Sequence, residues 1–305
     1  MIRRPMTKTE YSDANLYFRE RFGSKVYKAA ISLDVTCPNR DGTKGLGGCV
    51  FCSLGGSGEF STKGDDVIEQ INSAIEKLSA KVSPETRYIA YFQSFTNTYC
   101  EVSFLEEKIR KAFSHQRICA VSIATRPDCL SEDMILMLSR MNKIKPVMVE
   151  LGLQTIHEKT AEWFNRCYLT EEYDDAVRRL KSQGIEVITH LIFGLKDETR
   201  EMMLQSVKHV VDMGSDGIKF TCLYVLTGTG LEKEWRRGEI KVLSRDEYFD
   251  IVDEALKILP PEMIVHRLTG DGPKSILLEP SWTKDKRSVV NYINGRFEKR
   301  SVIAR

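Results

Sequence analysis

Short apolar runs alternate with amphipathic helical stretches along most of the chain, and this alternation limits the fold more than any other feature. Six runs are near-continuous in apolar residues, as expected for strands that are covered on both faces: Tyr27–Val35, Arg87–Gln93, Ile118–Thr125, Pro146–Leu153, Glu186–Phe193 and Gly217–Val225. At least one helical stretch follows each run: Asp65–Leu78, Phe104–Phe113, Ser131–Met141, Glu158–Phe164 with Glu171–Ser182, Thr199–Met213, and Arg245–Leu259. A last short extended piece spans Ile264–Leu268.

Repeated strand–helix units predict an α/β protein with a parallel sheet. A full barrel of eight units would need two more strands than the six found. We therefore predict a partial TIM-type (β/α)6 barrel with short N- and C-terminal extensions. The expected organisation is an N-terminal extension over residues 1–26, a core barrel over 27–260, and a C-terminal extension over 261–305 that covers the barrel. Ligands of such folds gather at the carboxyl ends of the strands.

Composition narrows the class of protein. Of 305 residues, 42% are hydrophobic and 29% are charged, which excludes disordered, collagen-like and disulfide-scaffold chains. We expect a cytoplasmic protein with no membrane partner, because no apolar run nears the roughly 20 residues of a membrane helix and Met1–Lys8 lacks a signal-peptide pattern.

The two ends of the chain are basic. Met1–Lys28 holds seven Lys/Arg against three Asp/Glu, and Trp282–Arg305 holds seven against two. Such ends suit contact with a polyanion, or they are simply solvated.

Three of the eight cysteines cluster directly after the first predicted strand. Eleven residues separate Cys37 from Cys49, and two separate Cys49 from Cys52. The loop between them is rich in glycine, so its backbone can fold tightly around a bulky group. Three converging thiolates need a metal to neutralise them. A four-iron cluster held by three cysteines leaves one iron open, whereas structural zinc needs a fourth ligand, for which Cys100 is a candidate.

The remaining cysteines show no second three-cysteine spacing, and we predict no second cluster. Cys119 and Cys222 lie inside apolar strands, where free cysteine packs as a small hydrophobic residue. No role is predicted for Cys100, Cys129 or Cys167 beyond the zinc alternative.

The Cys-rich loop after the first strand resembles that of the radical S-adenosylmethionine (SAM) superfamily. The usual pattern there is Cys-x3-Cys-x2-Cys, and this chain departs from it by a long first gap, as does the elongator catalytic subunit. Five segments resemble motifs of the YhcC/YtqA-type group within that superfamily: Thr36–Thr43 (TCPNRDGT), Tyr91–Thr98 (YFQSFTNT), Thr125–Asp128 (TRPD), Glu150–Thr155 (ELGLQT) and Arg267–Asp271 (RLTGD). The resemblance spans roughly residues 15–285.

The resemblance implies one 4Fe-4S cluster that Cys37, Cys49 and Cys52 bind, and SAM bound at the open iron. Phe51 would shield the cluster or contact adenine. The superfamily's Gly-Gly-Glu motif for the SAM amino group is absent, and its replacements would be Gln93, Ser94 and Asn97, which could equally cap a turn.

A further set of site residues resembles oxygen-independent coproporphyrinogen oxidase, where Gln and Arg hold the SAM ribose and carboxylate. The matching residues are Gln154 and Arg166, with Asn165 alongside; the alternative for Arg166 is an ordinary surface arginine. His190 stands where that oxidase has Asp, and a satisfied core histidine is the other interpretation. Arg126 either reaches the SAM carboxylate or a substrate phosphate, or pairs with Asp128. Asp271 could serve the substrate side or a turn.

The function implied is cleavage of SAM to a 5′-deoxyadenosyl radical that abstracts hydrogen from a substrate, with flavodoxin or ferredoxin as reductant. The resemblance favours tRNA as a partner, with a wobble-uridine side chain as substrate. Three alternatives remain open: a small-molecule substrate, methyl transfer, and a zinc-bound noncatalytic RNA-binding protein.

Overall fold

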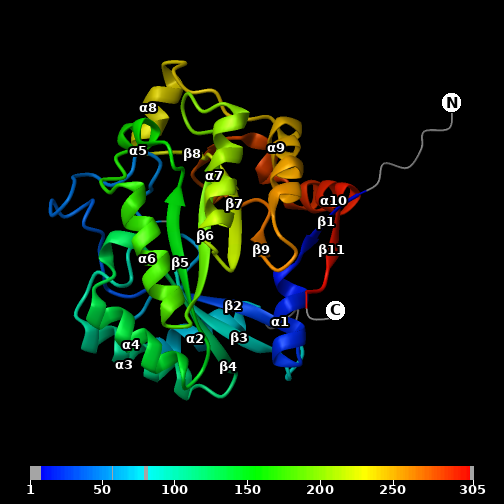
Figure 1. Ribbon diagram of the computed structural model, residues 1–305. Helices are drawn as coiled ribbons and strands as arrows, with labels where there is room; N and C mark the ends of the chain where they lie inside the picture. The colour runs from blue at the N-terminus through cyan, green and yellow to red at the C-terminus, as the bar shows by residue number, and fades with distance from the viewer. Residues whose placement is uncertain (1–7, 57, 79–81, 303–305) are drawn as a thin grey trace.

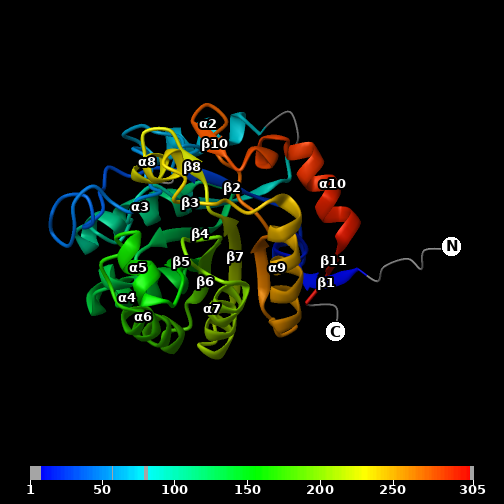
Figure 2. The same cartoon turned by 90° about the horizontal axis from the view of Figure 1, so that it is seen from above.

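A curled sheet of seven parallel strands forms the centre of the molecule, in the order β2-β3-β4-β5-β6-β7-β9 (Figures 1 and 2). The computed structural model describes residues 8–56, 58–78 and 82–302. The strands are β2 (Val26–Ile31), β3 (Arg87–Phe92), β4 (Ile118–Thr125), β5 (Val147–Gln154), β6 (Glu186–Phe193), β7 (Gly217–Cys222) and β9 (Ile264–Arg267). Sequential strands are neighbours, so the sheet winds in one direction into an open barrel.

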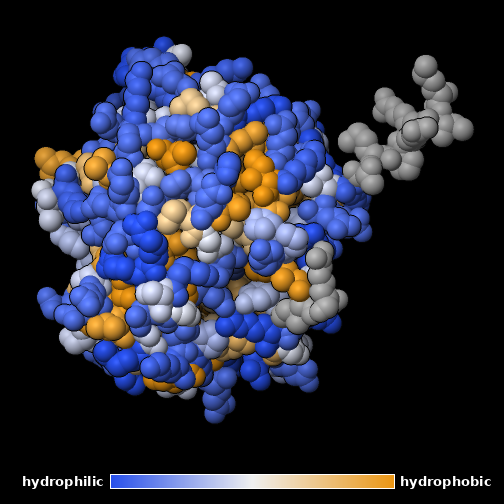
Figure 3. All heavy atoms as spheres, in the orientation of Figure 1, coloured by the Kyte–Doolittle hydropathy of each residue, from blue (hydrophilic) through white to orange (hydrophobic). Residues whose placement is uncertain are grey.

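Helices cover the outer, convex side of this sheet (Figure 2). They are α2 (Val67–Glu76), α3 (Val102–Ser114), α4 (Glu132–Asn142), α5 (Glu158–Trp163), α6 (Thr170–Ser182), α7 (Arg200–Asp212) and α9 (Arg245–Ile258). The cap residues explain several of the starts: Ser131 Oγ accepts from the Met134 amide, and Thr199 Oγ1 from the Met202 amide. The outer surface is largely hydrophilic with separate hydrophobic patches (Figure 3). Among the described residues, no helix combines the length and apolarity that a membrane span requires.

The inside of the barrel is layered, because side chains two residues apart along a strand point to the same face. The layer at the amino ends is apolar and is closed by Phe18 of α1 (Ala14–Phe22); from the strands it contains Val26, Ile89, Ala120, Met148, Ile188 and Ile264. One step toward the carboxyl ends, the layer becomes polar and charged. It contains Lys28, Tyr91, Ser122, Glu150, His190 and Lys219.

The two ends of the described chain meet beside the barrel. Strand β1 (Thr9–Ser12) pairs in parallel with β11 (Phe297–Arg300), which follows α10 (Lys286–Arg296). Both termini therefore lie on one side of the molecule (Figure 1). Shorter elements complete the fold at the carboxyl ends of the strands: β8 (Val225–Leu226) paired with β10 (Leu277–Glu279), α8 (Gly230–Arg236), and the 3₁₀ turns η2 (Pro127–Cys129) and η3 (Ser281–Lys284).

The predicted partial TIM-type barrel is confirmed, and the piece at Ile264–Leu268 provides the seventh strand. Two predicted strands matched their full ranges, Ile118–Thr125 and Glu186–Phe193. The predicted run Gly217–Val225 divides into β7 and β8, because the chain leaves the barrel after Cys222 to pair with β10. The division at residues 26 and 260 stays a prediction, and its first seven and last three residues lie outside the described part.

Candidate active site

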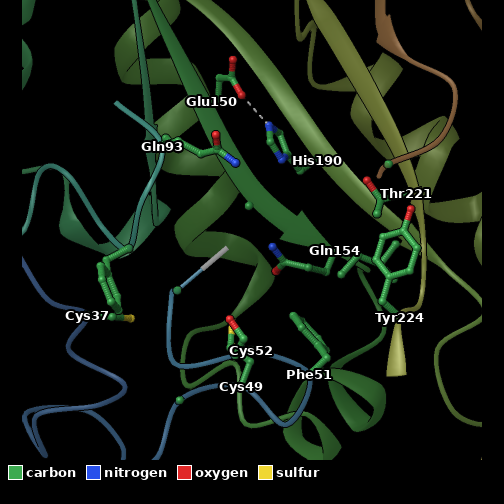
Figure 4. A pocket seen from close by; sticks show the side chains of 18 of the residues that line it. Cys37, Cys49, Phe51, Cys52, Gln93, Glu150, Gln154, His190, Thr221 and Tyr224 are labelled. Carbon is green, nitrogen blue, oxygen red and sulfur yellow. Dashed lines mark hydrogen bonds and ion pairs between the residues drawn. The ribbon is translucent and has the colours of Figure 1, made fainter. Parts of the chain in front are cut away.

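A cavity of about 330 Å³ opens at the carboxyl ends of the barrel strands. The loop after β2 contributes Cys37, Cys49, Phe51 and Cys52 to its wall, and the strand ends contribute residues that include Gln93, Arg126, Gln154 and His190. Figure 4 shows the cysteines on one side of this cavity, with Glu150 and His190 deeper in the barrel and Thr221 and Tyr224 across from them. The structure therefore brings most of the predicted site residues to one pocket.

The three predicted cluster ligands are partly buried cysteines that form no disulfide within the described residues. The pKa of Cys49 is raised well above its usual value, first by a hydrogen bond with Cys52 and by burial, while the Arg126 charge opposes the shift. Figure 4 shows Cys37 apart from Cys49 and Cys52. Within the described residues, no three Cys, His, Asp or Glu side chains form a ready-made ligand set, so binding one cluster requires these side chains to turn toward each other.

The donor chemistry of this loop fits an iron–sulfur cluster. Three cysteines line one wall, and thiolate is the usual cluster ligand. Cys100, the candidate for a fourth zinc ligand, lies outside the described pocket wall, and its Sγ contacts Asn97 O at 3.4 Å. The prediction that Cys119 and Cys222 are buried in strands is confirmed, although Cys222 also lines the pocket.

The Cys-rich loop is tied to the turn after α5 by two asparagines. Asn165 Nδ2 donates to Leu46 O at 3.2 Å and to Gly48 O at 3.0 Å. In return, the fully buried Asn39 donates through Nδ2 to Asn165 O. Asn165 has a φ of 62°, a left-handed conformation that asparagine tolerates better than most residues. The sequence match included Asn165 only because it precedes Arg166. The structure adds its hydrogen bonds to the Cys-rich loop.

Removing the Asn165 amide should weaken retention of the cluster while leaving the barrel folded. Two lost hydrogen bonds to the loop backbone correspond to roughly 1–3 kcal/mol, so we expect Asn165→Ala to lose iron to a chelator about 10-fold faster than wild type. Asn165→Gly is the matched control for backbone strain, since glycine adopts positive φ freely. Iron release at the wild-type rate from both variants would contradict a role for the amide.

Gln154 and Arg166 both line the pocket. They differ in how firmly hydrogen bonds hold their side chains. Gln154 ends β5 with a φ of 65°, a strained conformation of the kind that collects at functional sites. Arg166 is fully buried and donates to Tyr168 O, Leu153 O, Thr155 O and the Glu158 carboxylate. The predicted contact of Arg166 with SAM would have to displace one of these bonds, so Gln154 is the better placed of the two.

Arg126 has the ion pair that the alternative interpretation expected. Its Nε and Nη2 reach Asp128 at 2.9 and 2.8 Å, and its Nη1 donates to Arg166 O at 2.8 Å. It also lines the pocket and acts on Cys49 electrostatically. Arg126 is thus held rigidly against the cysteines, with part of its guanidinium directed at the cavity.

The three residues predicted after β3 take different positions. Gln93 lines the pocket. Ser94 is buried, with its Oγ 2.9 Å from Ser61 Oγ. Asn97 is buried, and its Nδ2 donates to Phe92 O and Ala124 O at 3.0 and 2.9 Å, which is the turn-stabilising role. Phe51 lines the pocket and packs against Phe164 with ring centroids 5.2 Å apart.

His190 belongs to a buried network centred on Glu150, which the sequence prediction missed. His190 Nε2 lies 2.8 Å from Glu150 Oε2, and Ser122 Oγ donates to Oε1 at 2.5 Å. Lys28 and Lys219 form ion pairs with the two oxygens of the same carboxylate. Burial, then the Lys219 charge, lowers the pKa of His190 to about 4, so its imidazole is neutral near pH 7. The sequence signal for this network was the presence of a glutamate and a lysine inside otherwise apolar strands.

The fold and this pocket together define the class of protein: a partial barrel with a cavity at the carboxyl ends of its strands, lined by three cysteines of the loop after β2. The profile of the radical SAM superfamily matches residues 37–210, and that of the Radical_SAM C-terminal domain matches residues 215–299. The chain belongs to the radical SAM superfamily, and the enzymes of this superfamily use a 4Fe-4S cluster and SAM.

Three curated relatives show how far the likeness extends. The chain is 43% identical to the uncharacterized protein YtqA of Bacillus subtilis, over 96% of this chain and 91% of that protein. It is 33% identical to YhcC of Escherichia coli, over 87% and 85%. A tRNA uridine(34) acetyltransferase of Methanocaldococcus jannaschii is 32% identical over 59% of this chain and 33% of its own length. The predicted membership of the YhcC/YtqA-type group is confirmed.

Among solved structures, the Methanocaldococcus infernus Elp3 with an N-terminal deletion has the same fold. The TM-score is 0.68 at 22% identity, and the match covers 92% of this chain and 65% of that one. At this identity the likeness concerns the architecture alone, and it agrees with the partial barrel described above.

Proposed function

We propose that this radical SAM enzyme abstracts a hydrogen atom from the side chain of a tRNA wobble uridine. The single observation that carries the substrate class is the similarity, over 59% of the chain, to a protein described as a tRNA uridine(34) acetyltransferase. When bound, the cluster and SAM supply the 5′-deoxyadenosyl radical, which can attack a carbon too inert for acid–base chemistry. A cytoplasmic location stays a prediction from the sequence.

Some residues of this chain would hold the cofactors, and others would exclude water from the cavity. In the proposal, Cys37, Cys49 and Cys52 bind the cluster, with Phe51 packed beside them. Gln93 and Gln154 would orient SAM from the ends of β3 and β5, and Arg126 would provide positive charge next to the cysteines. The apolar layer that Phe18 closes lies at the amino ends of the strands, and it would help to keep water from the radical on that side.

The basic ends support contact with a polyanion. The pairing of β1 with β11 brings the two ends of the described chain together, although Arg3, Arg4 and Arg305 lie outside the described residues. The basic C-terminal segment also begins at the rim of the pocket, because Lys286 Nζ pairs at 2.7 Å with Asp271, which lines it. Phosphate contacts dominate the affinity of proteins for nucleic acids.

Binding of tRNA should therefore weaken steeply as salt rises. We expect the double variant Lys286→Gln/Arg287→Gln to bind tRNA more weakly and to reduce the slope of log affinity against log salt by roughly 1 to 2. Lys208→Gln on the outer helix α7 is the control, since its i,i+4 partner Asp212 holds it away from the pocket end. Filter binding over a salt series measures both quantities; a salt-independent interaction would favour a small-molecule substrate.

Product analysis tests the reaction itself. The reconstituted enzyme is incubated anaerobically with SAM, dithionite and tRNA from cells that lack the gene, and the nucleosides are digested and analysed by mass spectrometry. The proposal expects 5′-deoxyadenosine together with a mass change confined to the wobble uridine. S-adenosylhomocysteine in place of 5′-deoxyadenosine would indicate methyl transfer, and unchanged tRNA would overturn the proposed substrate. A flavodoxin or ferredoxin that replaces dithionite would identify the proposed reductant.

A further inference from the structure

The charged layer inside the barrel gathers several basic side chains around its one carboxylate. Lys28 from β2 and Lys219 from β7 both pair with Glu150. Their ammonium groups also lie 4.5 and 4.8 Å from the centre of the Tyr91 ring. Arg267 on β9 is the Cα partner of Lys219 in the sheet register. Like charges directly opposite each other on neighbouring strands are unfavourable, so an anion bound next to Arg267 would relieve this repulsion.

Nothing in the described part of the chain neutralises Arg267. Both Glu150 oxygens are already occupied: Oε1 by Lys28 and Ser122, and Oε2 by Lys219 and His190. Asp271 is the acidic side chain of the RLTGD segment, and it pairs with Lys286. The Arg267 guanidinium lines the pocket, is solvent-exposed, and makes no hydrogen bond or ion pair within the described residues.

Two buried hydroxyls belong to residues around the segment from Arg267 to Gly270. Tyr224 lines the pocket, whereas Thr269 lies outside its lining. Neither hydroxyl makes a short hydrogen bond among the described residues, but each interacts with the other and with Cys222. Gly270 allows this close packing, because a Cβ there would lie 2.9 Å from Tyr224 Oη and 3.1 Å from Thr221 Cγ2. The Tyr224 hydroxyl is therefore the one that can offer a hydrogen bond to a ligand in the pocket. Figure 4 shows Thr221 and Tyr224 across the pocket from the cysteines.

The electrostatic state of the neighbouring histidine agrees with a positive field. The pKa of His190 is lowered to about 4, first by burial and then by the Lys219 charge, with Arg267 adding to the shift. Neutral His190 therefore adds no charge to the layer near pH 7. Arg267 lines the open cavity as a positive charge without an ion-pair partner among the described residues.

We propose that Arg267 and Tyr224 form a subsite for an anionic group of the substrate, a carboxylate or a phosphate, opposite the cysteine side of the pocket. A guanidinium provides two parallel N–H donors for such a group, and the Tyr224 hydroxyl provides a further donor. The subsite would hold the substrate by its charged end and leave an adjacent carbon facing the cofactor side. This inference rests on the proposed function only in assuming that the ligand is the substrate of the radical reaction.

Anion binding tests the subsite without relying on catalysis. The reconstituted enzyme is unfolded thermally under anaerobic conditions in a series of inorganic phosphate and, separately, of malonate, with ionic strength held constant by sodium chloride. A ligand that binds only the native state raises the melting temperature in a concentration-dependent way, which yields its dissociation constant. Stabilisation by phosphate alone or by malonate alone would tell which anionic group the subsite prefers.

Arginine variants assign the effect to the subsite. We expect Arg267→Gln to weaken anion binding about 10- to 100-fold, the usual worth of a hydrogen-bonded charged contact, and Arg267→Lys to keep part of it. Arg178→Gln, which changes an exposed arginine on the outer helix α6, should bind like wild type. Wild type that binds neither anion, or equal losses in Arg267→Gln and Arg178→Gln, would overturn the subsite.

The same preparations distinguish failure of the subsite from failure of the proposed function. SAM cleavage without substrate requires the cluster but not an anion at the subsite, so wild type and Arg178→Gln should form 5′-deoxyadenosine at the same rate in the absence of tRNA. Wild type that binds an anion but leaves tRNA unchanged would retain the subsite and reject tRNA as substrate. Loss of substrate-free 5′-deoxyadenosine formation in Arg267→Gln would instead place Arg267 in cofactor binding and overturn the subsite.

Discussion

Replacement of Cys37, Cys49 or Cys52 by alanine should abolish the brown colour of the reconstituted enzyme and reduce 5′-deoxyadenosine formation by at least about 100-fold, because the cofactor carries the chemistry. All three cysteines line the pocket, and none forms a disulfide within the described residues. Each replacement removes one of the three thiolates that are predicted to bind the cluster. The measurements are iron and sulfide content, the visible spectrum, and chromatography of the SAM products.

Cys100→Ala is the matched control for this experiment. Cys100 is also partly buried, but its Sγ contacts Asn97 O and lies away from the pocket wall. The variant should keep both the cluster and SAM cleavage. A wild-type protein that retains zinc, and loses it on replacement of Cys100, would contradict the assignment of the three-cysteine site to an iron–sulfur cluster.

Replacement of Glu150 by glutamine should destabilise the fold by about 3–5 kcal/mol, the usual cost of removing one partner from a buried ion pair. The glutamine amide is isosteric with the carboxylate, yet it would leave the Lys28 and Lys219 charges inside the barrel without a counter-charge. Thermal or denaturant unfolding of the protein measures the effect. Glu254→Gln, which breaks the exposed pair with Arg200, is the control and should unfold close to wild type.

The pH dependence separates loss of charge from loss of packing. Burial by itself would raise the pKa of Glu150, but the Lys219 and Lys28 charges outweigh it and hold this pKa well below its ordinary value of 4.5. A lowered carboxyl pKa contributes stability that is fully present above the unfolded pKa and is lost as pH falls below it. The advantage of wild type over Glu150→Gln should therefore be full above about pH 4.5 and shrink below it. A difference that does not change with pH would indicate packing alone.

Much of the fold followed from local pattern. Apolar runs covered on both faces, each followed by an amphipathic stretch, predicted six of the seven sheet strands and the partial barrel. The predicted starts at Ser131 and Thr199 are the cap residues of α4 and α7, which begin one residue later. Pairing of β1 with β11 was not predictable, because it joins short segments from opposite ends of the chain.

The candidate site was likewise predicted only in part from the sequence. Cys37, Cys49 and Cys52 were recognised because their spacing is local, and the structure brings them to one wall. The Arg126–Asp128 pair was one of the two predicted interpretations, because the two residues are close in sequence. The contacts of Arg166 were not predicted, since folding brings its guanidinium to Glu158 and to backbone carbonyls. Gln154 lines the cavity from the end of β5.

The sequence by itself determined the alternation of strands and helices, the three-cysteine loop and the family. These features depend on residues that are close in sequence, so the period of apolar side chains and the spacing of ligands can be read from the sequence alone. The tertiary structure decided which charges share an environment. Lys28, Glu150, Lys219 and Arg267 lie on four different strands, and only closure of the sheet brings them into one layer. Burial makes the balance of those charges matter, because the low polarity of the interior strengthens every unpaired charge.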